Sequence, residues 1–267
     1  MLKKIINKAL RVGGLKVQLI NRNELEFYKS LENSALLYSQ VDQKSRELIS
    51  PLMPFSKSDC AQDLFPLVFS NNLDPKYFVE FGATNGVQGS NTWLLEKKLG
   101  WKGILAEPAK FWHKSLFQNR ECNIETKCIA KEGGETYQFL EIGDSERSNA
   151  TLSTLEKYSQ NGDWAEKIRK EKLSKKYEVE TLSLENLLEK YDAPHEIEFM
   201  SIDTEGSELD ILRGFNFDKY KINSICVEHN RVHKTRLKLY QLLTDKGYKR
   251  VFKNISRGDD WYVLDRK

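Results

Sequence analysis

Three acidic residues each stand where a short apolar run ends. Glu80 follows residues 77–79, Glu107 follows 103–106 and Asp203 follows 198–202. Continuous apolar runs of this length are typical of strands that helices cover on both faces of a parallel sheet. Ligands of such a sheet bind beyond the carboxyl ends of its strands, so we expect the three carboxylates to line one crevice. Carboxylates in that place can accept hydrogen bonds from ribose hydroxyls or hold a cationic group.

The stretch of residues 77–93, YFVEFGATNGVQGSNTW, predicts the first of these strands, a tight turn and the start of a helix. Its glycines, Gly82, Gly86 and Gly89, do not have the G-x-G-x-x-G spacing of dinucleotide-binding folds. Glu80 at the strand end can hold a cationic amino group, which S-adenosylmethionine has and NAD lacks. Alternatively, Gly82 and Gly86 only permit a tight turn. Glu107 stands 27 residues after Glu80, a position that suits hydrogen bonds to ribose hydroxyls.

Candidate catalytic groups follow two later strands. His229 comes just after the expected strand 222–227, and its unperturbed pKa near neutrality suits a general base. The alternative is a structural histidine that bonds backbone at the strand end. Asp203 and Glu205 could orient an acceptor, act as the base, contact the charged end of a cofactor or hold a divalent ion. Because the sequence shows no third acidic ligand beside them, we predict no metal.

Residues 142–178 interrupt the alternation of strands and helices and predict a lid over the acceptor site. Arg147, Ser148 and Asn149 are its residues best able to bind a polar acceptor. Asn230 and Trp261 are further acceptor candidates, because both are expected at the crevice. The alternatives are a solvated, charge-rich surface for the lid segment and a core position for Trp261.

The elements that position these residues alternate along the chain. Strands are expected at 77–81, 103–107, 124–130, 136–140, 198–202 and 222–227, with a closing pair at 250–252 and 261–264. Helices are expected at 23–49, 91–99, 110–119, 163–176, 183–190, 207–212 and 235–246, and the polar turn in 58–65 should enter a further helix that runs to about residue 70. This order predicts an α/β fold with a mostly parallel sheet.

Composition narrows the function classes. The chain has 267 residues, of which 39% are hydrophobic, and a net charge of +3 that is too small to predict a nucleic-acid partner. It has no apolar run of membrane-spanning length. Its cysteines are scattered without metal-ligand spacing, which favours a reducing cytoplasm.

The N-terminal region, residues 1–57, is expected to form accessory helices. Residues 1–22 could form a basic amphipathic helix that rests on an anionic membrane surface, although such a segment more often packs on its own domain or frays. No cleavage site follows it, so we do not interpret it as a signal peptide. The helix at 23–49 either caps the catalytic domain or forms a contact in a homodimer.

Several motifs together resemble the FkbM-type S-adenosylmethionine-dependent methyltransferases. They are VEFGATNGV (79–87) with GSNT (89–92), GWKGILAEP (100–108), TLSLE (181–185) and IDTEG (202–206). Gln62-Asp63-Leu64 also resembles a family motif before the first strand, although Cys60-Ala61 stands where glycine is commoner. The resemblance covers residues 58–267. It implies the Rossmann-like class I methyltransferase fold, with a seven-stranded sheet, helices on both faces and a C-terminal antiparallel strand.

The resemblance also implies the cofactor, S-adenosylmethionine, and an acceptor class, the hydroxyl groups of sugars, nucleotide sugars, polysaccharides or other metabolites. Carried over to this chain, the cofactor-binding residues are Gln62, Glu80, Gly82, Asn85, Gly86, Ser90, Asn91, Glu107, Pro108 and Asp203. The remaining alternatives are an N- or O-methyltransferase of another small metabolite, an NAD-type Rossmann enzyme and a catalytically silent scaffold. The glycine spacing and Glu80 count against NAD, and the three acidic strand ends count against a silent scaffold.

Overall fold

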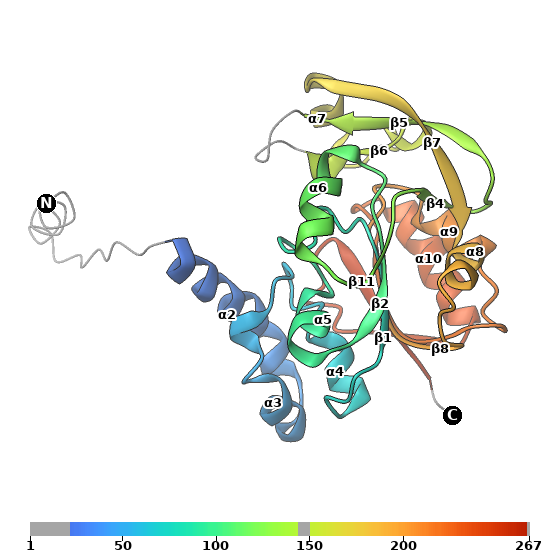
Figure 1. Ribbon diagram of the computed structural model, residues 1–267. Coiled ribbons are helices and arrows are strands. Elements are labelled where there is room, and N and C mark those ends of the chain that lie inside the picture. Colours follow the sequence, from blue (N-terminus) through green and yellow to red (C-terminus); the bar gives the residue numbers. More distant parts are fainter. Residues whose placement is uncertain (1–21, 144–149, 266–267) are drawn as a thin grey trace, which may run out of the picture.

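The computed structural model describes residues 22–143 and 150–265 (Figure 1). Its main sheet has seven strands in the order β10-β11-β9-β8-β1-β2-β3. Strand β11 runs antiparallel to both of its neighbours, whereas β3, β2, β1, β8 and β9 pair in parallel. The predicted class I methyltransferase fold, with one antiparallel strand near the C-terminus, is confirmed.

The strands of this sheet are β1 (Tyr77–Phe81), β2 (Lys102–Ala106), β3 (Asn123–Glu125), β8 (Glu196–Ile202), β9 (Lys221–Glu228), β10 (Tyr248–Val251) and β11 (Asp259–Leu264). The helices are α2 (Arg22–Gln40), α3 (Gln43–Ile49), α4 (Phe65–Ser70), α5 (Trp93–Leu99), α6 (Lys110–Asn119), α7 (Glu166–Glu171), α8 (Leu184–Lys190), α9 (Glu208–Gly214) and α10 (His233–Asp245). Short 3-10 turns lie at η2 (Met53–Phe55), η3 (Ala150–Leu152) and η4 (Glu156–Tyr158).

Helices cover both faces of the main sheet (Figure 1), and they bury its alternating side chains. In β1, Val79 and Phe81 face the core shared with α8, α9 and α10, whereas Phe78 faces the core shared with α3, α4 and α5. This alternation follows from the two-residue period of a strand. Burial of each such side chain contributes about 1.5–3 kcal/mol. Both faces are therefore apolar, and polar function is left to the strand ends.

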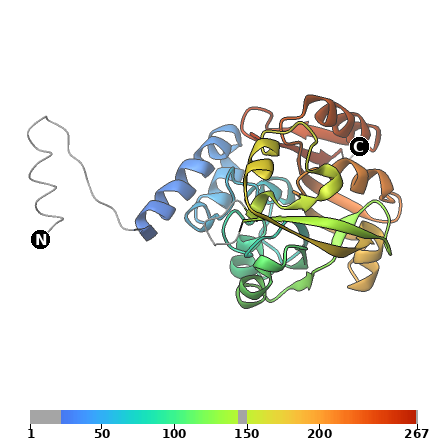
Figure 2. The same cartoon turned by 90° about the horizontal axis from the view of Figure 1, so that it is seen from above.

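A second, four-stranded sheet lies across the carboxyl edge of the main sheet (Figures 1 and 2). Its order is β4-β7-β5-β6, formed by β4 (Cys128–Ala130), β5 (Thr136–Ile142), β6 (Thr154–Leu155) and β7 (Ser174–Ser183). The expected single strand 124–130 is wrong, because its two halves pair in different sheets, β3 with β2 and β4 with β7. Between them, Glu125 Oε1 accepts hydrogen bonds from the backbone N–H groups of Thr126 and Lys127 and holds the turn.

The prediction of one helix over the charge-rich segment 163–176 is also wrong, because a helix and a strand share this segment. Helix α7 ends at Glu171, and β7 begins at Ser174 and pairs with β5 from Thr136 to Ile142. Pairing with a strand distant in sequence therefore overrides the local helical pattern, since strand formation depends on cross-strand packing more than on the residues themselves.

The N-terminal part consists of two helices rather than one continuous helix. Asp42 begins α3 as its N-cap, with its side chain accepting a hydrogen bond from Ser45 N at 2.8 Å. Helix α2 extends away from the rest of the described fold (Figure 2), and it exposes Leu25, Phe27 and Tyr28. Over residues 22–143 and 150–265, no helix is long and apolar enough to cross a membrane. The predicted basic helix at 1–22 falls almost wholly outside the described residues.

Candidate active site

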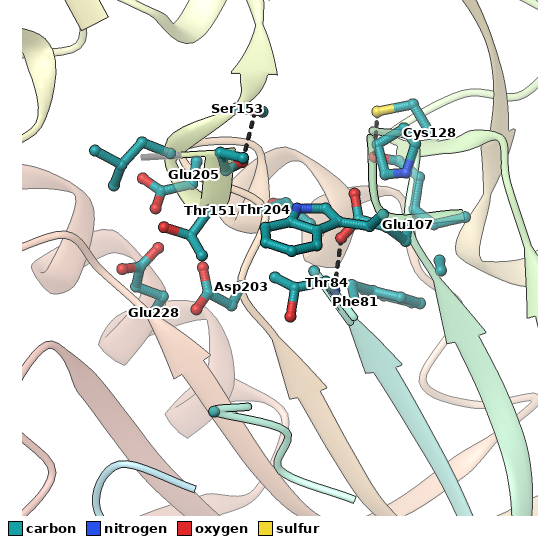
Figure 3. A pocket seen from close by; sticks show the side chains of 18 of the residues that line it. Phe81, Thr84, Glu107, Cys128, Thr151, Ser153, Asp203, Thr204, Glu205 and Glu228 are labelled. Carbon is teal, nitrogen blue, oxygen red and sulfur yellow. Dashed lines mark hydrogen bonds between the residues drawn. The ribbon is translucent and has the colours of Figure 1, made fainter. Parts of the chain in front are cut away.

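A cavity of about 360 Å³ lies at the carboxyl ends of β1, β2, β8 and β9, beneath the second sheet (Figure 3). This size is in the range of roughly 300–1,000 Å³ that small-molecule sites have. We call it the first cavity. Its walls come from all of these strand ends and from the 150–155 segment of the second sheet. The main sheet thus supplies the floor, and the segment inserted after β5 supplies the roof.

Glu107, directly after β2, is buried and lines the first cavity. Its Oε2 accepts a hydrogen bond from Thr84 N at 2.7 Å (Figure 3), and its Oε1 accepts one from Ala109 N at 2.8 Å. These bonds fix the carboxyl group at the cavity wall. Burial raises the pKa of Glu107 to about 7, against the opposing effect of the two backbone donors. Each oxygen keeps a lone pair that can accept from a ligand hydroxyl.

Beyond Glu107, the wall of the first cavity becomes apolar. It is formed by Pro108, Trp112, Cys128, Phe139 and Leu155. Several of these side chains belong to the small core between α6 and the second sheet. A flat, largely apolar group fits this end, with Glu107 at its polar border.

Gly82 connects β1 to the first cavity in a conformation that requires glycine. Its φ is +76°, and a Cβ atom there would collide with the backbone carbonyl oxygen of Asp203. The turn after β1 and the loop after β8 therefore lie against each other, which keeps both backbones at the cavity floor.

A second cavity of about 410 Å³ continues from the first. Asp59, Gly89, Trp164, Asp203 and Glu228 line both, so the two cavities meet at these residues. The rest of the second cavity is mostly polar: Cys60, Gln62, Asn91, Asn230, Arg231, Ser256, Arg257, Gly258 and Asp259. Burial and the nearby carboxylate of Asp203 raise the pKa of Asp259 to about 7.

Where the cavities meet, three carboxyl groups come together, and we call Asp203, Glu205 and Glu228 the carboxylate cluster (Figure 3). One oxygen of each lies within 4.8 Å of the others. Asp203 is exposed to the cavity, whereas Oε2 of Glu228 is buried without a hydrogen-bond partner. Burial and the neighbouring negative charges raise the pKa of Glu228 well above its usual range.

The loop that presents Asp203 and Glu205 is shaped by Glu208 at the start of α9. Glu208 is buried, and its Oε1 accepts hydrogen bonds from the backbone N–H groups of Thr204 and Gly206 and from the Thr204 hydroxyl. Gly206 has a φ of +125°, and a Cβ atom there would press on Tyr158. The cluster is thus held by backbone geometry and does not depend on flexible side chains alone.

Arg169 of α7 ties the roof to the cluster. Its guanidinium donates to Oε2 of Glu205 at 2.5 Å, to Asp163 at 2.7 Å and to the carbonyl oxygen of Leu152 at 2.9 Å. Thr154 adds a hydrogen bond to the carbonyl oxygen of Glu205. Arg169 is buried although it belongs to a charge-rich run, and the sequence carries no signal that separates it from its exposed neighbours.

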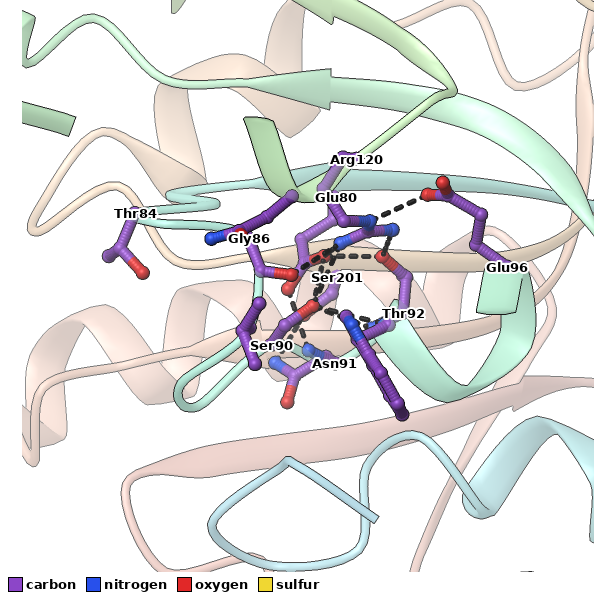
Figure 4. A network of polar contacts seen from close by, with 12 residues as sticks. Glu80, Thr84, Gly86, Ser90, Asn91, Thr92, Glu96, Arg120 and Ser201 are labelled. Atoms are coloured by element: carbon purple, nitrogen blue, oxygen red, sulfur yellow. Dashed lines mark hydrogen bonds and ion pairs between the residues drawn. The ribbon is translucent and has the colours of Figure 1, made fainter. Parts of the chain in front are cut away.

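Glu80 has a different place from the one its motif predicts. It does not line either cavity, and its oxygens accept hydrogen bonds from Ser90, Asn91 and Thr92 (Figure 4). The guanidinium of Arg120 lies 3.7 Å from Oε2. Because both oxygens are engaged inside the protein, the prediction that Glu80 holds a cofactor amino group has no support in this geometry.

The other predicted cofactor residues divide between the cavities and the turn beside them. Gly82, Glu107, Pro108 and Asp203 line the first cavity, and Gln62 and Asn91 line the second. Asn85, Gly86 and Ser90 line neither. Asn85 Oδ1 instead accepts from the N–H groups of Val87 and Gln88, and Ser90 donates to Glu80. The structure therefore gives these three a role in building the turn.

His229, the predicted general base, lies outside the walls of both cavities. It is 2% exposed and lines neither cavity. Its Nδ1 accepts a hydrogen bond from Arg231 N at 3.0 Å, and its Nε2 faces Asp260 at 3.8 Å. Burial lowers its pKa. The imidazole thus lies beside the end of β9 and does not form part of the wall of either cavity.

The acceptor predictions have three outcomes. Asn230 lines the second cavity, as expected. Trp261 does not, because it is fully buried and packs on Phe65 with ring centroids 5.0 Å apart. Arg147 and Asn149 lie outside the described residues.

The most important residue that the sequence analysis missed is Glu228. Glu228 is the last residue of β9, and Asp203 directly follows β8. The argument that an acidic residue at the carboxyl end of a parallel strand lies at the crevice therefore applies to both. Asp59 and Asp259 were missed as well, and neither ends a parallel strand, so their places in the second cavity come from tertiary packing alone.

Known proteins similar to this chain are methyltransferases. A sequence model described as the Methyltransferase FkbM domain matches residues 80–250, which is more than half of the chain. No curated protein sequence gave a significant match. Among solved structures, the methyltransferase FkbM from Methylobacillus flagellatus KT is similar at 12% identity and a TM-score of 0.45, over 98% of this chain and 70% of that one. The precorrin-6y C5,15-methyltransferase from Geobacter metallireducens GS-15 is similar at 10% identity and a TM-score of 0.38, over 75% of this chain and 85% of that one.

Proposed function

The chain belongs to the FkbM family of methyltransferases, and from this premise we propose that it transfers a methyl group from S-adenosylmethionine to a hydroxyl group of a sugar, nucleotide sugar or polysaccharide. One observation carries this proposal: the carboxylate cluster stands where a nucleoside-sized cavity meets a polar one. A donor in the first cavity and an acceptor in the second would meet at these carboxylates.

The first cavity fits the cofactor that the family uses. Glu107 would accept hydrogen bonds from the ribose hydroxyls, since its oxygens keep lone pairs after bonding Thr84 and Ala109. The apolar wall with Pro108 and Trp112 would take the adenine. Asp59 and Asp203 would face the positively charged methionine end. When bound, S-adenosylmethionine supplies an electrophilic methyl group.

The acceptor needs a group that takes its proton, because a neutral hydroxyl is a weak nucleophile. We assign this role to the carboxylate cluster in place of His229. Asp203 and Glu228 line both cavities, whereas the imidazole of His229 lines neither. Asp203 is also exposed to the cavity, so an acceptor hydroxyl can reach it.

The lining of the second cavity favours a polyhydroxyl acceptor. Asn230 and Ser256 can donate and accept hydrogen bonds, Arg231 and Arg257 donate, and Asp259 accepts. A sugar ring presents several hydroxyls that both donate and accept, so it can satisfy such a wall. A mainly apolar metabolite would leave these polar groups without partners, at a cost of about 1–3 kcal/mol for each buried one.

Two measurements in sequence test the proposal. Calorimetric titration with S-adenosylmethionine should show binding at one site. A screen of free and nucleotide-linked sugars with methyl-labelled cofactor should then give a labelled, base-stable ether, and Asp203→Asn should abolish labelling while the protein still melts cooperatively. Absence of cofactor binding by the folded protein would refute the proposal, and label on an amine would favour the N-methyltransferase alternative.

A further inference from the structure

We propose that the carboxylate cluster and the side-chain amide of Asn230 form a binding site for a divalent cation such as Mg²⁺ or Mn²⁺. This inference deepens the proposed function and rests on it, because the same carboxylates stand where donor and acceptor would meet. It also replaces the expectation of no metal, which depended on the lack of a third acidic ligand. Glu228 is that ligand.

The spacing of the cluster fits a single ion. One oxygen from each of Asp203, Glu205 and Glu228 lies within 4.8 Å of the other two. Oxygen ligands lie about 2.0–2.6 Å from Mg²⁺ or Ca²⁺, so two ligands on opposite sides of one ion are about 4–5 Å apart. The three oxygens can therefore bind one ion with little movement of their side chains.

Asn230 provides an independent indication that a ligand belongs here. It is 4% exposed, and its Nδ2 donates to Oε2 of Glu205 at 3.4 Å, which places the amide against the cluster. Its Oδ1 is buried and has no hydrogen-bond partner among the described residues. A buried amide oxygen without a partner is costly, and an ion would satisfy it.

The balance of charge points the same way. Within the described part of the chain, Arg169 is the basic residue that forms an ion pair with the cluster, and the atom it contacts is Oε2 of Glu205. The contact from Asn230 falls on that same oxygen, so Oε1 of Glu205 remains for a ligand. Glu228 also keeps a buried oxygen without a partner. Three ionised carboxylates facing one guanidinium would repel each other, and a divalent cation would offset that repulsion.

The donor atoms select the kind of ion. Carboxylate and amide oxygens suit Mg²⁺, Mn²⁺ and Ca²⁺, whereas Zn²⁺ and Cu²⁺ favour imidazole or thiolate. The nearest candidate of that kind in sequence, His229, does not belong to the cluster; its Nδ1 accepts from Arg231 N, and its Nε2 lies 3.8 Å from Asp260. Because Asp203 and Glu228 line both cavities, an ion here would also contact an acceptor hydroxyl and lower its pKa.

The test is a calorimetric titration of the chelator-treated, full-length protein with MnCl₂, repeated with MgCl₂, in the absence of acceptor. We expect one ion to bind. Glu228→Gln should weaken Mn²⁺ binding at least tenfold, and Asn230→Ala at least threefold. The matched control is Asp259→Asn, which removes a carboxyl group from the same cavity but lies outside the cluster; it should change affinity less than threefold. Mn²⁺ should raise the melting temperature of the wild type and of the control, but not that of Glu228→Gln.

Two results would overturn the inference. One is a folded wild-type protein that binds no Mn²⁺ at about 1 mM, and the other is equal weakening by Asp259→Asn and Glu228→Gln, which would mean diffuse attraction by an acidic cavity. A titration with S-adenosylmethionine on the same samples separates this from the proposed function. If the cofactor binds and the metal does not, the metal site alone fails; if the metal binds and the cofactor does not, the proposed function fails.

Discussion

Glu80 lies inside β1, one residue before its end, whereas Asp203 directly follows the neighbouring parallel strand β8, and the surroundings of the two carboxyl groups are opposite. Glu80 is enclosed by three hydrogen-bond donors of the following turn and by Arg120, whose guanidinium also bonds Glu96 at 2.6 Å (Figure 4). Asp203 faces open space beside two more carboxyl groups (Figure 3). The first arrangement, Glu80 with its three donors and Arg120, builds the turn, and we call it the closed network. The second arrangement, the carboxylate cluster, keeps oxygens available for a ligand.

An acidic residue at a strand end is therefore not a functional group by position alone. What distinguishes the two is whether partners from elsewhere use up the carboxylate oxygens. The carboxylate cluster keeps a buried oxygen on Glu228 without a partner, whereas neither oxygen of Glu80 is in that state. A buried polar group without a partner is destabilising, so its presence is a reason to look for a ligand.

The largest expected effect on turnover comes from removing a carboxylate of the carboxylate cluster. Asp203→Asn should reduce turnover about 10²–10⁴-fold, because the group that faces both cavities can no longer take a proton or a cation. Stability should change little or increase, since one of several repelling carboxylates is gone. Turnover with labelled cofactor and a urea titration measure the two effects. A large loss of stability with little loss of turnover would place Asp203 with the closed network instead.

A substitution in the closed network should have the opposite effect, a large loss of stability. Arg120→Leu should lower the free energy of unfolding by about 3–5 kcal/mol, because it leaves Glu80 and Glu96 without their buried cation. Urea unfolding measures this. The control is Lys127→Met, which breaks an exposed pair with Glu180 away from this network and should cost less than about 1 kcal/mol. Equal effects of the two substitutions would contradict a stabilising role for the closed network.

Glu107 is intermediate between the carboxylate cluster and the closed network. Its carboxyl group accepts hydrogen bonds from backbone N–H groups and still lines the first cavity. Glu107→Gln should weaken binding of S-adenosylmethionine by about 1.5–3 kcal/mol, through loss of charged hydrogen bonds. With a pKa raised to about 7, the wild-type carboxyl group is protonated below that pH and accepts hydrogen bonds less well. Wild-type affinity should therefore fall as pH decreases through 7, by about tenfold per unit. Calorimetry from pH 5.5 to 8 checks this, and Glu107→Gln should lack the dependence.

The same shift affects the stability of the cofactor-free protein. The pKa of Glu107 is raised in the folded state from a usual value of 4.5 to about 7. Between these values the folded state keeps a proton that the unfolded state has released. Glu107 therefore makes the protein less stable as pH rises from about 4.5 to about 7, and this contribution should be absent from Glu107→Gln.

The smallest effect is expected at His229. His229→Asn keeps a hydrogen-bond acceptor for Arg231 N and should reduce turnover less than tenfold, since the imidazole lines neither cavity. Cofactor affinity should stay the same. Thermal melting with and without cofactor must accompany the kinetics. A loss of a hundredfold or more in a stable protein would restore His229 as the base and remove the cluster from that role.

The sequence by itself determined the framework of the site. Apolar runs and the acidic residues that follow them are local patterns, and parallel strands end at one edge of a sheet, so these patterns suffice to place Glu107 and Asp203 at the crevice. The family motifs around residues 79–92 and 202–206 added the cofactor. The predicted α/β fold with a mostly parallel main sheet was confirmed for the same reason.

Only the tertiary structure decided which of these carboxylates are free. Arg120 reaches Glu80 from a helix end 40 residues later, and Arg169 reaches Glu205 from 36 residues before it, across an inserted second sheet. Neither contact leaves a periodic mark in the sequence, because ion pairs form between side chains that the fold brings together. The division of residues 124–130 between two sheets and the strand at 174–183 depend likewise on pairing partners distant in the chain. Local pattern sets where a strand ends, and long-range packing sets what its last residue touches.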